Sequence, residues 1–392
     1  MTAPGLLQGA EALSDGPALV DRILRAGLFM RASDVHFDPE EGGVRVRFRI
    51  DGELEEVLRI PSSMQGALTG RLKVLAGLDI AERRAPQDGG FAWRPPAGAA
   101  AAGVSLDVRM ATLPVRRGER ITLRLLETGG ERLSIDGLGM PDEGRAMFDA
   151  VLRSPHGLVL LAGPTGSGKT TTLYAAIQAL LAAGPKNIVT VEDPVEYEIP
   201  GVAQAEVDSS DKVNFTKALR SLLRHDPDVV MIGEIRDPES LDAAVKAALT
   251  GHLVLSTLHA NGARAVVVRL LDMGLERSLV SATLRLAVAQ RLVRRLCPAC
   301  RIPAPAGGGF VPHGCPECGG RGYAGRIGIF GFYSPETDRE TRMEDDAAAK
   351  VAAGITSRAE TIRALGETSP EICEKMAKNI QEPINGGDLQ KI

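Results

Sequence analysis

Alternating hydrophobic and charged positions dominate the first part of the chain. Between Val44 and Ile50 apolar residues alternate with arginines, and the segment Leu54–Ile60 can pair with this one across the Asp51-Gly52 turn. Alternation of this kind predicts half-buried antiparallel strands with one charged face. Apolar residues with helical spacing predict helices at 18–30 and 71–78. Two further strands are predicted at 104–110 and 120–126. The region is therefore predicted to be an α+β domain.

A different pattern begins after a Gly-containing stretch at 129–144, which has the composition of a linker. Short apolar runs now alternate with longer segments of helical spacing, which predicts a mostly parallel sheet covered by helices. The predicted strands are 157–162, 188–192, 229–235 and 253–258, and the predicted helices are 169–183, 218–224 and 241–249. We therefore expect an N-terminal domain at 1–128, a linker at 129–144 and a larger domain at 145–392.

Composition narrows the class of protein. The chain has 392 residues, of which 44% are hydrophobic and 24% charged, enough apolar material for a substantial core. Its formal net charge of −4 argues against nucleic acid as the main partner. It contains no apolar run long enough to cross a bilayer and no secretory signal pattern, so we expect a cytoplasmic protein that reaches a membrane only through partners.

A glycine-rich segment after the first predicted strand of the larger domain matches G-x-x-x-x-G-K-[ST] in full and opens a predicted helix. In this context backbone N–H groups and the helix N-terminus bind phosphate oxygens, a lysine reaches the β- and γ-phosphates, and a threonine ligates Mg²⁺. The alternative is a glycine-rich turn without a ligand. The predicted nucleotide contacts are Gly163, Pro164, Thr165, Gly166, Ser167, Gly168, Lys169, Thr170 and Thr171.

Acidic residues end two of the other predicted strands. Asp228 to Glu234 is an apolar run closed by a carboxylate, as the metal-binding segment of an ATPase requires. Pro194 ends a second strand and is expected to turn Glu192, Asp193 and Glu196 toward the same sheet edge. His259 ends a third strand, where it can sense the γ-phosphate. The alternatives are solvated charges at strand ends and a histidine that is merely packed or exposed.

Four of the five cysteines form two C-x-x-C pairs. In a cytosolic chain this spacing favours a metal over disulfides, and a soft tetrahedral ligand set favours zinc. Because four thiolates leave no open coordination position, we expect a structural site. The predicted ligands are Cys297, Cys300, Cys315 and Cys318, whereas Cys373 is expected to be an ordinary thiol.

Several segments together resemble the secretion ATPases, which include type II secretion, type IV pilus assembly and pilus retraction ATPases. Residues 190–197 resemble the "Asp box" of that family, 224–237 its Walker B segment and 250–261 its "His box". The resemblance extends over roughly 18–330 and includes the N-terminal segments 31–36, 44–52, 106–114 and 118–124. It implies an α/β fold with a RecA-like P-loop ATPase core, an N-terminal α+β (PAS-like) domain and a small zinc knuckle.

The resemblance also implies roles for particular residues. Glu196 would activate the attacking water, Glu234 would support Mg²⁺ and His259 would sense the γ-phosphate of ATP. Arg109 and Arg124 would close onto the nucleotide from the N-terminal domain, where a planar guanidinium can bind two phosphate oxygens. The remaining arginines that match the family near the active site or the subunit interface are Arg220, Arg224 and Arg236.

The family's activity would make this chain a homohexameric motor that hydrolyses MgATP to power pilus or pseudopilus assembly or protein secretion. Its partners would be an inner-membrane platform protein and cytoplasmic docking proteins. We expect that the family's first N-terminal domain is absent and that 331–392 diverges. Two alternatives remain: a nucleotide-binding regulatory subunit with little turnover, and a retraction or type IV secretion ATPase, which the cysteine pairs argue against.

Overall fold

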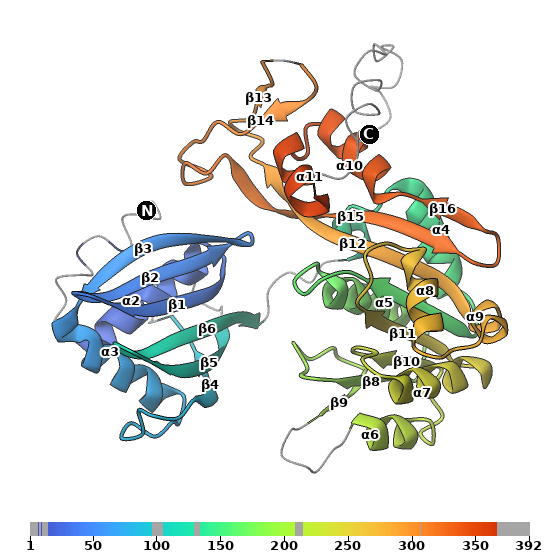
Figure 1. The fold of residues 1–392 in the computed structure, drawn as a ribbon, viewed down its shortest axis with the longest axis horizontal. Helices are drawn as coiled ribbons and strands as arrows, with labels where there is room; N and C mark the ends of the chain where they lie inside the picture. Colours follow the sequence, from blue (N-terminus) through green and yellow to red (C-terminus); the bar gives the residue numbers. More distant parts are fainter. Residues whose placement is uncertain are drawn as a thin grey trace. The chain divides into compact units, whose positions relative to one another are not determined.

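A computed structural model describes residues 15–95, 105–128, 134–207, 215–305 and 307–366, together with Leu7 and Gly9 (Figure 1). The chain forms two compact units, Met1–Arg132 and Leu133–Ile392. Among the described residues, no helix combines the length and the apolarity that crossing a membrane requires.

In the described part of the N-terminal unit, two helices pack on an antiparallel sheet. The sheet has six strands in the order β3-β2-β1-β6-β5-β4. The predicted hairpin is confirmed, because β2 and β3 pair in antiparallel register on either side of Asp51-Gly52. The strands are β1 (Ala32–Glu40), β2 (Gly43–Ile50), β3 (Glu53–Pro61), β4 (Gln87–Trp93), β5 (Ser105–Val115) and β6 (Gly118–Thr128), and the helices are α2 (Gly16–Phe29) and α3 (Ser62–Leu75).

The alternation in β2 separates a core from a charged face. Val46 and Phe48 are buried with side chains from α2 and α3. On the other face the arginines of β2 meet carboxylates of the neighbouring strand, as in the pair Arg47–Asp38, whose atoms lie 2.8 Å apart. The sequence reading missed β1 and β4. In β1 the apolar positions are few, and the polar residues between them are held by pairing with two neighbouring strands.

The second unit contains an eight-stranded sheet in the order β16-β15-β12-β7-β11-β10-β8-β9. Strands β12, β7, β11, β10, β8 and β9 are parallel to their neighbours in this order. Strand β15 pairs with β12, and β16 with β15, in antiparallel orientation. The strands are β7 (Gly157–Ala162), β8 (Ile188–Glu192), β9 (Ala203–Glu206), β10 (Val229–Ile232), β11 (Leu253–Leu258), β12 (Leu284–Leu296), β15 (Tyr323–Ser334) and β16 (Arg339–Thr341), with β13 (Ile302–Pro303) and β14 (Phe310–Val311) forming a separate ribbon.

Helices cover both faces of this sheet (Figure 1). Alternate side chains of each central strand point to opposite faces, so Leu160 packs with residues of α7 and α8, whereas Leu161 packs with residues of α4 and α5. Burial on both faces is the reason that the strands read as continuous apolar runs. The helices are η2 (Ile135–Leu138), α4 (Asp142–Leu152), α5 (Lys169–Ala183), α6 (Phe215–Leu222), α7 (Pro238–Leu249), α8 (Ala265–Asp272), α9 (Arg277–Thr283), α10 (Met343–Ala352) and α11 (Arg358–Leu365).

The stretch expected to be a linker, 129–144, is only partly one. Residues 129–133 lie outside the described part of the chain. Ile135 and Leu138 are buried in the core of the second unit, and α4 begins at Asp142. This segment therefore belongs to the second unit, because its apolar residues pack beneath α5. Of the region expected to diverge, 331–366 forms strand and helix, and 367–392 lies outside the described residues.

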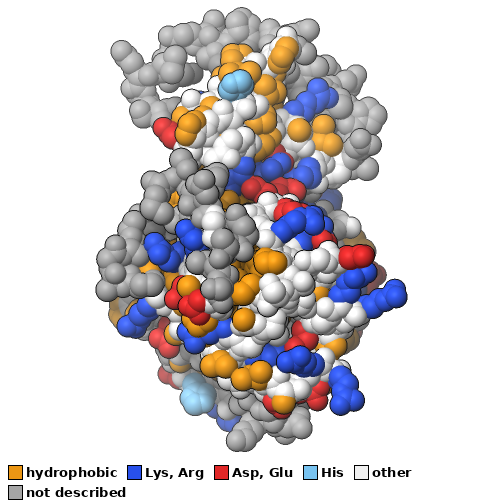
Figure 2. Space-filling view, turned by 90° about the vertical axis from the view of Figure 1, so that its left-hand side faces the viewer, with side chains coloured by type: hydrophobic (Ala, Val, Ile, Leu, Met, Phe, Trp, Pro, Cys, Tyr) orange, Lys and Arg blue, Asp and Glu red, His pale blue; other side chains and the backbone are white. Residues whose placement is uncertain are grey.

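The described surface carries both signs of charge. On the face that Figure 2 shows, basic and acidic side chains are interspersed. Exposed pairs such as Arg264–Asp338 and Arg339–Glu143 have atoms 2.8 Å apart. Pairs of this kind contribute little, at most about 1 kcal/mol each, because water screens them. Stability therefore depends more on the apolar cores and on the charges that are buried.

Glu360 is the centre of a buried charge cluster that joins α11 to β12. Its side chain is 2% exposed, and its oxygens accept hydrogen bonds from the guanidinium of Arg294 at 2.5 Å and that of Arg363 at 2.9 Å. The backbone N–H of Arg294 donates to the same carboxylate at 3.1 Å. Burial alone would raise the pKa of Glu360, but the hydrogen bonds from Arg294 and Arg363 outweigh it and lower that pKa to about 2.

We predict that Glu360→Gln lowers the free energy of unfolding at pH 7 by about 2–4 kcal/mol, because it removes the charge of a buried carboxylate that accepts hydrogen bonds from two guanidinium groups. The folded-state pKa lies below the ordinary value of 4.5. The carboxylate therefore stabilises the fold fully above that value, and its contribution is lost as the pH falls toward 2. Denaturant titrations at pH 7 and at pH 3.5 would measure a difference between the two proteins that shrinks in acid.

The matched control is Glu56→Gln, which removes an exposed carboxylate paired with Arg59 three residues along the chain. This variant should unfold like the wild type. A Glu360→Gln protein as stable as the wild type at pH 7 would contradict the assigned role of the cluster.

Candidate functional site

The glycine-rich loop connects β7 to α5, as predicted. Gly168 is the residue before the first turn of α5 and has φ +88, a left-handed conformation that favours glycine. A methyl group on Gly168 would lie 2.8 Å from the side-chain nitrogen of Gln290, and one on Gly163 would lie 2.6 Å from the Gln290 carbonyl oxygen. Strand β12 is therefore packed against the loop and leaves room there only for glycine.

The loop presents hydrogen-bond donors suited to an anion. Lys169 Nζ donates to the carbonyl oxygens of Gly163 and Pro164 at 2.9 and 3.0 Å. Burial lowers the pKa of Lys169, Glu234 opposes that shift, and Arg291 adds to it. The Ser167 hydroxyl is buried and has no hydrogen-bond partner among the described residues. A buried hydroxyl without a partner is costly, and a ligand bound in this loop would satisfy it.

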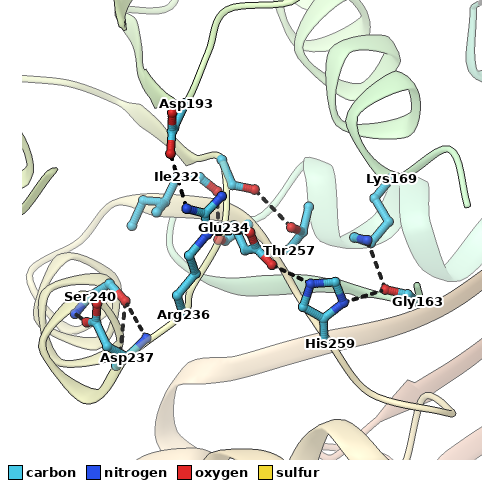
Figure 3. A network of polar contacts seen from close by, with 12 residues as sticks. Gly163, Lys169, Asp193, Ile232, Glu234, Arg236, Asp237, Ser240, Thr257 and His259 are labelled. Atoms are coloured by element: carbon cyan, nitrogen blue, oxygen red, sulfur yellow. Dashed lines mark hydrogen bonds and ion pairs between the residues drawn. The ribbon is translucent and has the colours of Figure 1, made fainter. Parts of the chain in front are cut away.

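Two predicted residues meet beside the loop at the carboxyl edge of the sheet (Figure 3). Glu234 follows β10, and His259 follows β11, the strand next to β7. His259 Nε2 lies 2.7 Å from Glu234 Oε1, while its Nδ1 lies 3.2 Å from the Gly163 carbonyl oxygen. Lys169 and His259 thus approach the same carbonyl group, so the histidine joins the acidic strand end to the start of the loop.

Arg236 connects the two acidic strand ends (Figure 3). Its Nε donates to Glu234 Oε2 at 2.6 Å, and its Nη1 donates to Asp193 Oδ2 at 3.1 Å. The hydrogen bond that Arg236 donates to Glu234 raises the pKa of Arg236, and Asp193 adds to the effect. This arginine neutralises part of the negative charge at the sheet edge. Arg236 thus lies in one hydrogen-bonded network with Glu234 and Asp193.

The expectation that three carboxylates of the second cluster face the sheet edge is wrong for Glu192. Its side chain is buried, 2% exposed, and accepts hydrogen bonds from Tyr174, from Thr190 at 2.6 Å and from Gln204 at 3.1 Å. Strand β8 ends at Glu192 with all of its residues buried, so this carboxylate still points into the protein. Glu196 lies beyond the strand end and is half-buried.

The predicted arginines of the N-terminal unit are neighbours in its sheet. Arg109 on β5 pairs directly with Arg124 on β6, and Arg124 pairs in turn with Asp34 on β1. Arg124 Nε donates to Asp34 Oδ1 at 3.3 Å, and Arg49 on β2 lies 3.8 Å from the same carboxylate. The pairing register thus places Arg49 and Arg124 on either side of Asp34, with Arg109 next to Arg124 on the following strand.

The other two predicted arginines are placed differently. The side chain of Arg220, on α6, lies outside the described residues. Arg224 is exposed and follows α6 in the turn that leads to β10, where its guanidinium donates to Ser221 Oγ at 3.3 Å. This turn adjoins the amino ends of the strands, the edge opposite the phosphate loop. Arg224 therefore does not share a site with the loop of its own unit.

Sequence reasoning missed two residues of β12 beside the phosphate loop. Gln290 accepts a buried hydrogen bond from the Thr172 hydroxyl at 2.9 Å and so connects β12 to α5. Arg291 is half-buried, burial lowers its pKa, and it lies 3.2 Å from where a methyl group on Gly163 would be. In the sequence, these two polar residues interrupt an apolar run that was not predicted to be a strand. That interruption was the only sign that they could belong to the site.

The four predicted cysteines converge at the end of β12 and the start of β15. Their ligand atoms all lie within 4.8 Å of one another. Three sulfur–sulfur separations are 3.8 Å, for Cys297–Cys315, Cys300–Cys318 and Cys315–Cys318. A tetrahedron with metal–sulfur distances of about 2.3 Å has edges of about 3.8 Å. The backbone N–H of Gly322 lies 3.1 Å from the Cys318 sulfur, a donor of the kind that supports a metal-bound thiolate.

Two curated relatives are similar over most of the chain. Type II secretion system protein E of Dickeya dadantii (strain 3937) is 42% identical over 382 residues, covering 89% of this chain and 75% of that protein. The type IV pilus assembly ATPase PilB of Myxococcus xanthus (strain DK1622) is 47% identical over 341 residues, covering 82% of this chain and 59% of that protein.

Solved structures share the fold at lower identity. The Legionella pneumophila ATPase DotB has a TM-score of 0.66 at 22% identity, covering 89% of this chain and 95% of that one. The pilus retraction motor PilT has a TM-score of 0.60 at 24% identity, covering 91% and 99% respectively. A family model described as "Type II/IV secretion system protein" matches residues 11–382, a longer range than the 18–330 over which the motifs were recognised. The chain therefore belongs to the type II/IV secretion system protein family, whose named members include ATPases.

Proposed function

We propose that this chain is a motor ATPase that hydrolyses MgATP to power pilus or pseudopilus assembly or protein secretion. The observation that carries the proposal is the meeting of Lys169, Glu234 and His259 at one point beside the phosphate loop. A phosphate loop alone would serve a regulatory subunit equally well. The adjoining strand-end carboxylates and histidine favour a site that hydrolyses its nucleotide.

Roles follow from the chemistry of each side chain. The loop amides and Lys169 would bind the phosphates, and Thr170 with Glu234 would hold Mg²⁺, which neutralises phosphate charge when bound. Glu196 would orient the attacking water and take its proton. His259, held between Glu234 and the Gly163 carbonyl, is placed to respond to the terminal phosphate.

We further infer that the N-terminal unit is the PAS-like domain of the family and that it closes on the nucleotide. The support is its antiparallel sheet and the alignment of Arg109 and Arg124 beside Asp34. Arg220 and Arg224 would act across a subunit boundary in a homohexamer, since Arg224 lies at the wrong edge of its own sheet. The partners would be an inner-membrane platform protein and cytoplasmic docking proteins, which would place the motor at the cytoplasmic side of that membrane.

The cysteine cluster is proposed to hold a structural Zn²⁺. The sulfur separations of 3.8 Å suit a tetrahedral thiolate site. The four ligands lie in the connection between β12 and β15, and the strand β12 lies against the phosphate loop. A metal there would fix the end of a strand that supports the nucleotide site.

We predict that Glu196→Gln abolishes steady-state ATP hydrolysis, by at least about a hundredfold, while nucleotide affinity stays near the wild-type value. Lys169→Ala should lose both hydrolysis and affinity, because it removes the charge that binds phosphate oxygens. The measurements are phosphate release by the assembled protein and binding of a fluorescent nonhydrolysable ATP analogue. Glu198→Gln, an exposed carboxylate two residues further along, is the matched control and should retain turnover. Wild-type turnover in Glu196→Gln would refute the assigned mechanism.

We predict that elemental analysis of the purified protein finds about one zinc per chain and that Cys318→Ser loses most of it. The substitution should also lower the thermal unfolding temperature, since metal-binding free energy is part of folding free energy in such sites. Cys373→Ser is the matched control, because it removes the one cysteine outside the two C-x-x-C pairs. Full zinc content in Cys318→Ser, or none in the wild type, would contradict the site.

A further inference from the structure

The segment between β8 and β9, which carries Glu196, has its backbone held by side chains. Glu206 on β9 accepts the N–H of Val195 at 2.9 Å. Gln204, also on β9, accepts the N–H of Ile199 at 2.7 Å. These contacts anchor the segment to the outer strand of the sheet, on the side away from the phosphate loop. They do not connect Glu196 to the nucleotide site.

The side chain of Tyr174 makes that connection. The backbone N–H of Glu196 donates to the hydroxyl of Tyr174 at 3.2 Å, and that hydroxyl also hydrogen-bonds Glu192. Tyr174 is fully buried on α5, the helix that Lys169 begins. The two residues are five positions apart, which is about 7.5 Å along the helix axis. The Tyr174 ring also packs edge-on against Tyr197, with ring centroids 4.6 Å apart.

The direction of the hydrogen bonds in this network is determined. Glu192, as a carboxylate, only accepts, and its other contacts are Thr190 at 2.6 Å and Gln204 at 3.1 Å, both donors. Tyr174 must therefore donate its proton to Glu192 and use a lone pair to accept the Glu196 N–H. Burial and the hydrogen bond to Glu192 raise the pKa of Tyr174, so the phenol keeps its proton.

We propose that Tyr174 is a positioning residue that transmits the placement of the phosphate-loop helix to the backbone of Glu196. The inference rests on the proposed role of Glu196. When nucleotide binding fixes the first turn of α5, the Tyr174 hydroxyl holds the Glu196 N–H at a set distance from that turn. A nucleotide that fixes the loop would therefore also fix the distance between the loop and the backbone of Glu196. Alignment at this level matters, since a misplacement of about 1 Å can cost about a hundredfold in rate.

The test is Tyr174→Phe, which removes the hydroxyl and keeps the buried ring. We expect kcat for ATP to fall by about tenfold to a hundredfold, with KM within about twofold of the wild type. A nonhydrolysable ATP analogue should bind with wild-type stoichiometry and Kd, which shows that the phosphate loop remains folded. Tyr333→Phe is the matched control: it removes a tyrosine hydroxyl that donates to Asp338 at 3.0 Å, and it should leave kcat unchanged.

Hydrogen exchange provides a second measurement on the same protein. ATP analogue should slow amide exchange in the segment 193–199 of the wild type, and this protection should be absent from Tyr174→Phe. Equal protection in both proteins, or loss of analogue binding in Tyr174→Phe, would overturn the proposal, the latter because it indicates a purely structural role.

The two levels of inference fail separately. If Glu196→Gln is inactive and Tyr174→Phe turns over like the wild type, the positioning role is wrong and the proposed function stands. If Glu196→Gln retains full turnover, both are wrong. In the Glu196→Gln background, Tyr174→Phe should cause no further loss of residual activity, because it acts through the same residue.

Discussion

The parallel pairing of β7, β11, β10 and β8 is the constraint on which the site depends. Its register places the phosphate loop after β7, His259 after β11 and Glu234 after β10 at one edge of the sheet. Three segments that are far apart in the sequence therefore meet because their strands pair side by side. Side chains then refine the arrangement: Ser256 and Thr257 on β11 donate to the carbonyl oxygens of Ile232 and Gly233 and so hold the end of β10 in place.

Two polar networks of different character lie at this edge. The first, formed by Glu234, His259 and Arg236, is partly exposed (Figure 3). The second surrounds Glu192 and is buried, with a donor for each described contact of its carboxylate. A buried, satisfied network is rigid, whereas an exposed one can rearrange. The first suits binding of a phosphate and the second suits holding a backbone.

Strand β12 joins the two sites of the second unit. Near its middle, Gln290 contacts α5 and the phosphate loop; immediately after its end, Cys297 is the first of the four clustered cysteines. Arg294, between them, is held by Glu360 and lies over the ring of Tyr323 with its Cζ 4.3 Å from the centroid. The same strand therefore contacts the phosphate loop near its middle and leads into the cysteine cluster at its end.

The sequence by itself determined the elements whose signals are local. The loop at 163–170, the strands at 157–162, 188–192 and 253–258 and the four clustered cysteines could be identified because their chemistry lies in neighbouring residues. Only the tertiary structure decided that Glu192 is buried, since this depends on Tyr174 from another element. Likewise, β12 is a strand because β7 and β15 pair with it. Arg224 lies at the edge of the sheet opposite the phosphate loop because it precedes the amino end of β10. The spacing of apolar residues in one segment indicates which of its side chains are buried. It does not indicate which other strands or side chains the segment contacts, because those residues are far away in the sequence.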